Sequence, residues 1–294
     1  MTARQVIRFP RGRTVRALVW FTVVVSASPA AAAPGDGVIE PGEDEVAELQ
    51  QAVQNPVADL ISVPIQNNTF FDFGPREGTL NVTNIQPVLP LNLTDDWNLI
   101  TRTILPIVSQ PGLTPGQGRE TGLGDITFSA FLSPAKPSKL NFDGKLLWGV
   151  GPVALLPTAT DDRLGADKWA LGPGLVLLSM PGNWVIGTVL WNTWSFAGSG
   201  DEDVNRLTWQ YFVNYNLPKG WYLTTSPIMT ANWEADRGGD TWTVPVGGGL
   251  GRIFRIGSLP VNTQVQGFYN AVKPEFGAEW ELRFQVQLLF PKRR

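Results

Sequence analysis

The sequence predicts an all-β protein, a twelve-stranded antiparallel transmembrane β-barrel preceded by a short N-terminal helix. Three observations lead to this prediction: apolar residues that recur at every second position, connections that alternate between short and long, and tryptophans at the ends of the predicted strands. The segment "WELRFQVQLLF" (280–290) shows the first of these most clearly. Its alternate residues are apolar, and a period of two places them on one face of a β-strand. Such a face meets the core in a soluble sandwich but meets lipid in a barrel.

Twelve segments after residue 65 have this strand character, and none is convincingly helical. Segments 145–157 and 169–179 are apolar on both faces, whereas 204–217 and 221–233 alternate cleanly. The predicted strands are 66–73, 79–92, 97–109, 123–133, 145–157, 169–179, 184–196, 204–217, 221–233, 241–256, 260–271 and 280–290.

The connections alternate in length from the second strand onward. The short ones are 93–96, 180–183, 217–220 and 256–260; the longer, mostly acidic ones are 110–122, 157–169, 197–204, 234–241 and 272–279. Outer-membrane barrels have short periplasmic turns, longer external loops and an even number of strands. A soluble β-sandwich, the alternative fold, gives no reason for such regular alternation. The connection 134–144 is longer than a periplasmic turn requires.

Eight tryptophans lie at the ends of predicted strands, where a membrane barrel carries its aromatic girdles. These are Trp97, Trp169, Trp184, Trp194, Trp221, Trp233, Trp242 and Trp280.

Six prolines fall inside the predicted strands and oppose the barrel assignment. They are Pro87, Pro106, Pro152, Pro173, Pro227 and Pro245. Proline has no N–H for the ladder, and a closed barrel has no free edge. We therefore expect each of them at a bulge, a strand end or an irregular site facing the lumen.

The N-terminal region predicts export. Five arginines precede an apolar run that ends in small residues, which is the layout of a cleaved signal peptide over residues 1–32. We expect a periplasmic leader over 33–62, with an amphipathic helix at about 43–54, and the barrel over 63–294. We favour a loosely packed leader, and a periplasmic plug or lid is the alternative. Removing five of the 23 basic residues leaves 18 against 26 acidic ones, a net charge near −8. That balance argues against a nucleic-acid partner.

The chain has no histidine and no cysteine. A Ser-His-Asp triad and a His–Cys zinc site are therefore impossible. We expect no enzymatic activity, no cofactor and no metal site. The stretch "GDED" (200–203), with Asp161 and Asp162, could bind Ca²⁺ or bridge to lipopolysaccharide through divalent ions. We favour the alternative that it is a solvated loop.

Polar side chains on the lumen face of the predicted strands are the candidate site. Charged side chains in a lumen set the selectivity of a pore. The candidate lumen-lining residues are Arg102, Arg206, Gln210, Asn214, Gln264, Gln266, Glu281, Arg283 and Gln285. The alternative is that the charged ones pair with each other and brace a filled interior.

Several stretches, among them "NPVADLISVPIQNNTFFDFGP", "GLGDITFSAFLSPAKP" and "WTVPVGGGLGRIFRIG", resemble a large bacterial family of outer-membrane β-barrel proteins. Its members are transporter-like, are sometimes labelled neuromedin U, and look related to the barrel family linked to the meta-pathway of phenol degradation. The resemblance spans about 55–292 and brings no site residues. The last strand, with Phe290 before "PKRR", also resembles the signal read by the barrel-assembly machinery.

Together these observations predict a channel in the bacterial outer membrane for small, partly hydrophobic solutes, with outer-membrane lipid and lipopolysaccharide around it. A closed barrel with a structural or adhesive role through its acidic loops is one alternative. A soluble secreted β-sandwich that binds a ligand is the other.

Overall fold

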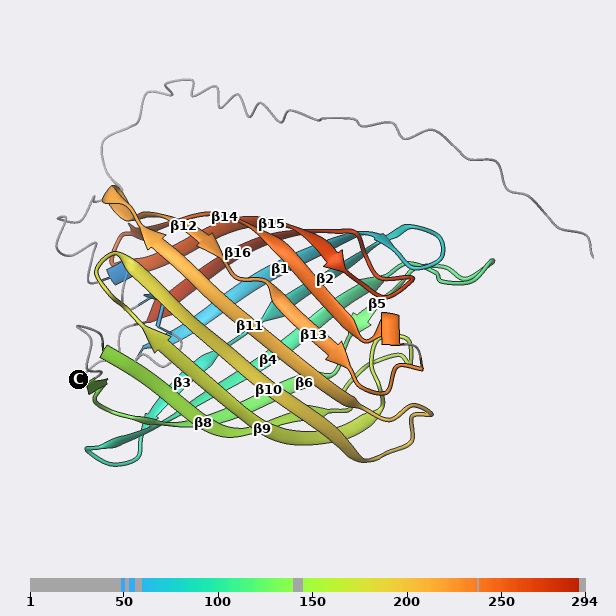
Figure 1. Cartoon of the computed structure of the whole chain (residues 1–294), viewed down its shortest axis with the longest axis horizontal. Coiled ribbons are helices and arrows are strands. Elements are labelled where there is room, and N and C mark those ends of the chain that lie inside the picture. Colours follow the sequence, from blue (N-terminus) through green and yellow to red (C-terminus); the bar gives the residue numbers. More distant parts are fainter. Residues whose placement is uncertain (1–48, 51–52, 56–59, 140–144, 237, 291–294) are drawn as a thin grey trace, which may run out of the picture. The chain divides into compact units, whose positions relative to one another are not determined.

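The computed structural model is one closed antiparallel β-barrel (Figure 1). It describes residues 49–50, 53–55, 60–139, 145–236 and 238–290. The expected signal peptide and most of the expected leader helix lie outside the described residues. Among the described residues, no helix is long and apolar enough to cross a membrane.

Sixteen strands and two short 3-10 helices make up the described chain. They are β1 (Ile61–Phe73), β2 (Gly78–Ile85), β3 (Val88–Asn92), β4 (Trp97–Gln110), β5 (Glu120–Leu123), β6 (Ile126–Pro134), β7 (Ser138–Lys139), β8 (Lys145–Leu156), β9 (Lys168–Ser179), β10 (Trp184–Gly198), β11 (Asn205–Asn216), η1 (Pro218–Gly220), β12 (Trp221–Thr225), β13 (Ile228–Asn232), η2 (Gly238–Asp240), β14 (Trp242–Ile256), β15 (Leu259–Val272) and β16 (Trp280–Phe290).

The strands form twelve staves, because β2 with β3, β5 with β6, and β12 with β13 each make one interrupted stave. Consecutive staves pair antiparallel, and β1 closes the ring against β16 from Ile61–Phe290 to Phe71–Trp280. The predicted twelve-stranded barrel is therefore confirmed, and the β-sandwich alternative is wrong. The first strand begins at Ile61, five residues earlier than expected.

The prolines explain the interruptions. Pro87 lies between β2 and β3, and Pro227 lies between β12 and β13. Pro106 accepts a hydrogen bond from the N–H of Gly124, at the break between β5 and β6. The chain thus places three of its prolines where the ladder is already broken, as their missing N–H requires.

The other three prolines also lie at irregular sites. Pro245 follows a bulge in β14. Pro152 of β8 lies opposite Pro173 of β9. The β6–β8 pairing is interrupted beside Pro152, between Ser129–Val153 and Leu132–Val150.

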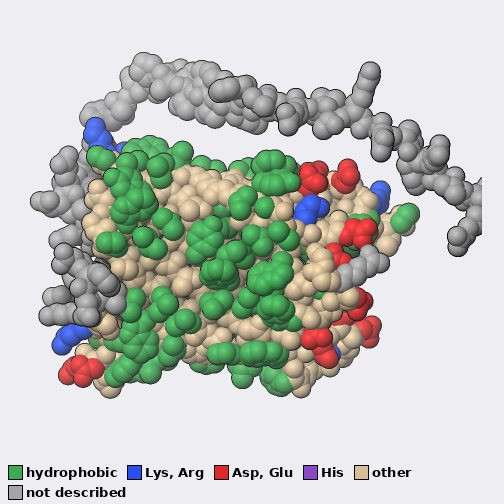
Figure 2. All heavy atoms as spheres, viewed as in Figure 1, with side chains coloured by type: hydrophobic (Ala, Val, Ile, Leu, Met, Phe, Trp, Pro, Cys, Tyr) green, Lys and Arg blue, Asp and Glu red, His purple; other side chains and the backbone are tan. Residues whose placement is uncertain are grey.

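The apolar face of the strands lies outside. On β16, Trp280, Leu282 and Phe284 are about half exposed, whereas Glu281 and Arg283 are buried. Figure 2 shows apolar surface over the wall of the barrel and most of the visible acidic side chains at one end. Other exposed apolar side chains come from around the ring: Ile65, Leu89, Ile107, Phe128, Leu171, Ile186, Leu223 and Leu250. An apolar wall around a polar interior is the arrangement of a barrel in lipid.

The two ends of the barrel differ. One end, which we call the short-turn end, has short turns such as 93–96 and 180–183. The other, the long-loop end, carries the connections 111–119, 157–167, 199–204, 233–241 and 273–279. Part of the connection after β6 forms β7, which pairs with the start of β8 at the short-turn end.

Candidate functional site

A polar network fills part of the interior towards the long-loop end. Arg283 is 1% exposed; its Nη2 lies 2.8 Å from Oε1 of Glu281, and its Nε donates to Oδ1 of Asn68 at 2.9 Å. The guanidinium also lies over the ring of Phe268, with 4.9 Å between Cζ and the ring centroid. Every charge in this network is therefore balanced within it.

The network also satisfies backbone groups that Pro227 leaves without a ladder partner. The N–H of Ser226 donates to Oε1 of Gln266 at 3.0 Å, and the carbonyl oxygen of Ser226 accepts from Nη1 of Arg283 at 2.6 Å. A buried backbone group without a partner would be costly. Gln266 and Arg283 thus replace the ladder hydrogen bonds that Ser226 lacks beside Pro227. The Ser226 carbonyl in turn helps to hold the Arg283 guanidinium.

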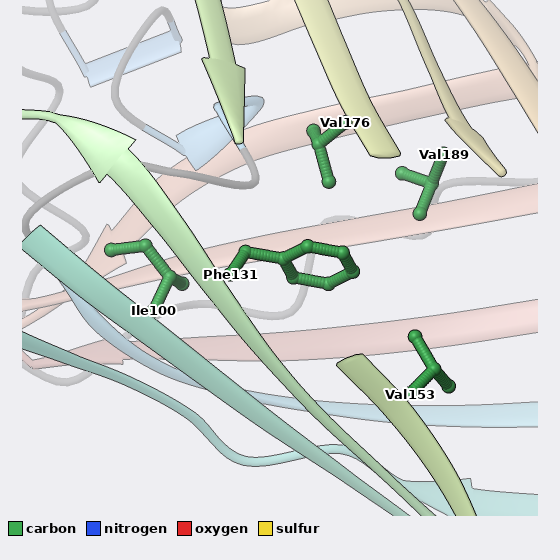
Figure 3. Packing of buried hydrophobic residues seen from close by; sticks show 5 residues of the cluster. All are labelled: Ile100, Phe131, Val153, Val176 and Val189. Carbon is green, nitrogen blue, oxygen red and sulfur yellow. The ribbon is translucent and has the colours of Figure 1, made fainter. Parts of the chain in front are cut away.

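An apolar cluster fills the interior beside β4, β6, β8, β9 and β10. Five side chains, each at most 5% exposed, converge there (Figure 3): Ile100, Phe131, Val153, Val176 and Val189. This cluster explains why segments 145–157 and 169–179 are apolar on both faces: one face meets lipid and the other packs inside the barrel. The interior is therefore not polar throughout, and the sequence pattern alone did not reveal which staves carry the apolar side.

A cavity of about 180 Å³ lies between these two regions. Its lining residues are Val53, Gln54, Asn55, Leu60, Ser62, Pro64, Gln66, Gln86, Val88, Arg102, Val189, Gln210, Phe212, Asn214, Tyr222, Thr224, Ser226, Asn262, Gln264, Gln285, Gln287 and Leu289. On β16 the inward residues Gln285, Gln287 and Leu289 line the cavity, and the next two inward residues, Arg283 and Glu281, belong to the network. The network therefore bounds the cavity on its long-loop side.

The described residues before β1, 49–50, 53–55 and 60, lie at the short-turn end, and several of them face the interior of the barrel. Leu49, Gln50 and Val53 have helical backbone, and the N–H of Gln54 donates to the carbonyl of Gln50 at 3.2 Å. Val53 is 6% exposed and packs in a cluster with Tyr222, Ile253 and Leu289, which belong to three different staves.

Side-chain amides hold this segment to the wall. Nε2 of Gln50 donates to the carbonyl of Trp221 at 3.1 Å, and Nε2 of Gln54 donates to Oδ1 of Asn216 at 3.0 Å. Asn55 and Leu60 also line the cavity. The segment thus narrows the lumen with a few apolar and amide contacts and without an ion pair among its described residues. The sequence predicted a helix here and favoured a loosely packed leader over a periplasmic plug or lid. The described residues instead contact side chains inside the barrel.

The structure places the candidate lumen residues in three groups. The first group lines the cavity and consists of Arg102, Gln210, Asn214, Gln264 and Gln285.

The second group belongs to the polar network and the third stands apart. Gln266, Glu281 and Arg283 are buried in the network. Arg206 is exposed near the long-loop end, paired in register with Thr193 and Asn232. The alternative of a braced interior therefore describes Glu281 and Arg283, and the open-lumen interpretation remains a prediction for the first group.

The predicted girdle tryptophans lie at stave ends. Seven are 36–52% exposed, namely Trp97, Trp169, Trp184, Trp194, Trp221, Trp233 and Trp280, and Trp242 is half-buried and makes an edge contact with Trp233 at 5.6 Å between centroids. Their role in anchoring the barrel at the membrane surfaces remains a prediction.

The "GLGD" segment, Gly122–Asp125, holds the loop 157–167 at the long-loop end. The carboxylate of Asp125 accepts from the N–H groups of Thr158, Ala159 and Ala166 at 3.1, 3.1 and 2.7 Å. A Cβ on Gly122 would lie 2.1 Å from Oγ1 of Thr160, so a larger residue here would require the Thr160 side chain to move.

The acidic loop residues pair with basic ones. Nε of Arg163 lies 2.8 Å from Oδ1 of Asp161, and Arg163 also bonds Glu120. These bonds from Arg163 lower the pKa of Asp161. Nζ of Lys168 lies 3.3 Å from Oδ1 of Asp203, and this contact together with Ser195 lowers the pKa of Asp203. Among the described residues, no three acidic side chains gather as a metal site would need.

A closed barrel with an apolar exterior, charged loops and a polar cavity defines a transmembrane β-barrel of the bacterial outer-membrane class. No protein-family model and no curated protein sequence matches the chain. The COG4313 outer membrane channel from Pseudomonas putida F1 shares the fold, with a TM-score of 0.58 and 18% identity over 80% of this chain and 97% of that one. At this identity the likeness shows the fold.

Two other outer-membrane proteins match with lower scores. Outer membrane phospholipase A from Escherichia coli has a TM-score of 0.41 and 14% identity over 80% of this chain and 97% of that one. A FadL homologue from Pseudomonas aeruginosa has a TM-score of 0.39 and 10% identity over 80% of this chain and 92% of that one.

Proposed function

We propose that this barrel is an outer-membrane channel for small, partly hydrophobic solutes, narrowed at its short-turn end by the segment before β1. The cavity carries the proposal. It lies in the interior of the barrel and is lined by amides and hydroxyls together with Val88, Val189 and Phe212. A pathway lined in this way suits solutes that have both a polar and an apolar part. We place the long loops outside the cell and the short turns in the periplasm.

The proposal needs a movement of the segment that contains Val53. Among its described residues, Leu49, Val53 and Leu60 make apolar contacts, and the side-chain hydrogen bonds of Gln50 and Gln54 are amide bonds, each worth about 0.5 to 1.5 kcal/mol net. Such contacts are compatible with opening on the microsecond-to-second timescale of local unfolding and lid motions. The family resemblance to transporter-like barrels also supports a channel.

Catalysis is the less favoured function. The sequence has no histidine to activate a serine. The polar groups in the lumen are mainly amides, which bind and orient ligands but do not serve as bases at neutral pH.

Liposome swelling tests the proposal. Purified protein is reconstituted into liposomes, which are then diluted into isotonic glycine, valine, leucine or arabinose; these solutes cross lipid slowly and differ in apolar content. We expect swelling with leucine and valine above that of empty liposomes and of arabinose. Folded barrels that pass none of the solutes would overturn the channel and favour the structural or adhesive alternative.

A further inference from the structure

Arg102 is the charged side chain of the cavity. It lies on β4, is half-buried, and donates through Nη2 to the side-chain oxygen of Gln86, which is 3% exposed. Among the described residues, no acidic side chain lines the cavity. Arginine remains protonated in proteins, so the cavity carries one positive charge with a neutral partner.

Arg102 and Arg283 differ in the partner that each guanidinium has. Arg283 has the carboxylate of Glu281 at 2.8 Å, so its charge is already balanced. Arg102 has an amide oxygen in the equivalent place. A confined charge is stabilised chiefly by an opposite charge and by hydrogen bonds to it. The cavity therefore favours an anionic group, which the network around Arg283 does not.

Apolar side chains lie next to Arg102. In register, Arg102 pairs with Val88 of β3. Val88 also packs against the apolar cluster that contains Ile100, two residues before Arg102 on the same strand. Val189 and Phe212 belong to that cluster and line the cavity as well. One end of a ligand at this place would thus meet a guanidinium and the rest would meet apolar surface.

We propose that the cavity selects small amphipathic carboxylates, with Arg102 binding the carboxylate and Val88, Val189 and Phe212 contacting the apolar body. Arginine matches a carboxylate through two parallel N–H···O bonds, and Gln86 holds the guanidinium in place for them. This inference rests on the proposed channel and assigns its solute class.

Equilibrium dialysis against the protein in lipid nanodiscs tests it, with empty nanodiscs subtracted. Labelled hexanoate is the probe, acetate keeps the charge without the apolar body, and hexanamide keeps the body without the charge. We expect wild-type protein to bind hexanoate at least tenfold more tightly than either comparison compound. Arg102→Gln should remove that preference, and Arg102→Lys should retain part of it, because lysine keeps the charge and loses the fork. Arg76→Gln, on an exposed loop, is the matched control and should bind as wild type.

The outcomes separate the two proposals. Equal binding of hexanoate and hexanamide by the wild type would overturn the role of Arg102, and this comparison needs no variant to fold. Equal binding of hexanoate and acetate would overturn the apolar part. In either case, leucine-driven swelling would leave the channel proposal standing, whereas loss of swelling with retained hexanoate binding would overturn only the channel.

Discussion

Arg283 and Glu281 lie two residues apart on β16, and their side chains form an ion pair inside the barrel, with 2.8 Å between Nη2 and Oε1. Both are almost fully buried, at 1% and 5% exposure. A period of two sends them to the same side of the strand, and the apolar residues Leu282 and Phe284 to the lipid side. This pair shows that the polar face of the last strand meets a packed interior at the long-loop side.

Removing one member of the pair should destabilise the barrel more than removing both. Arg283→Met leaves the Glu281 carboxylate buried without its cation, and we expect a loss of about 3 to 5 kcal/mol in the free energy of unfolding. Glu281→Gln combined with Arg283→Met should recover much of that loss. Urea titration of the protein folded in lipid vesicles measures both. A single variant within about 1 kcal/mol of wild type would show that the pair is not a buried contact.

The apolar interior should reject a methyl group at Gly174. A Cβ there would lie 2.8 Å from both Phe131 and Val153. We expect Gly174→Ala to cost about 1 to 3 kcal/mol by overpacking. Gly267→Ala is the control, because no atom lies within 4 Å of its added Cβ. If both variants unfold at the same urea concentration, this part of the barrel is open space.

Asp125 should protect the loop 157–167 from trypsin, which cleaves after Arg163. Hydrogen bonds to a charged acceptor contribute about 1.5 to 3 kcal/mol each at best, so losing three should loosen the loop. When whole cells are treated with trypsin, we expect the Asp125→Ala protein to be cleaved at this loop at least tenfold faster than the wild type. Asp162→Ala changes an exposed carboxylate of the same loop and should cleave at the wild-type rate. Equal rates for all three proteins would contradict the account of the "GLGD" segment.

The same loop should remain ordered until strongly acidic pH. The bonds from Arg163 lower the pKa of Asp161, so its contribution is present above the unfolded pKa of about 3.9 and disappears as the pH falls through the lower folded value. A spin label at Asp162→Cys, the one cysteine of such a chain, reports the mobility of the loop. The spectrum should stay constant from about pH 7 to pH 5 and sharpen only below about pH 4. With Asp161→Asn the label should already be more mobile than in the parent at pH 7, although Asp125 still holds the rest of the loop. Sharpening of the parent spectrum between pH 7 and 5 would assign the order to another group.

The period of two and the loop lengths predicted the barrel because both can be read from the local sequence. Each strand alternates between a lipid face and an interior face, and short turns alternate with long loops around the barrel. The prolines were correctly expected at irregular sites, but their partners were not, since the Ser226 backbone is satisfied by Gln266 and Arg283 from strands distant in sequence.

The site was less predictable for the same reason. An apolar inward residue such as Val176 has the same sequence signature as one facing lipid. The entry of Val53 into the barrel depends on contacts with Tyr222 and Leu289, which no local pattern announces. Polar residues such as Gln264 were expected to face the interior because an amide on a membrane strand finds no hydrogen-bond partner in lipid.

Locking Val53 to the barrel wall tests whether movement of the residues before β1 opens the pathway. The chain has no cysteine, so Val53→Cys with Leu289→Cys offers one possible disulfide between residues that share the cluster at the short-turn end. Swelling with leucine is measured on the oxidised protein and again after reduction. We expect the oxidised barrel to pass little and the reduced barrel to recover the wild-type rate. Equal swelling in both states, with the disulfide shown to have formed, would contradict a pathway opened by movement of this segment.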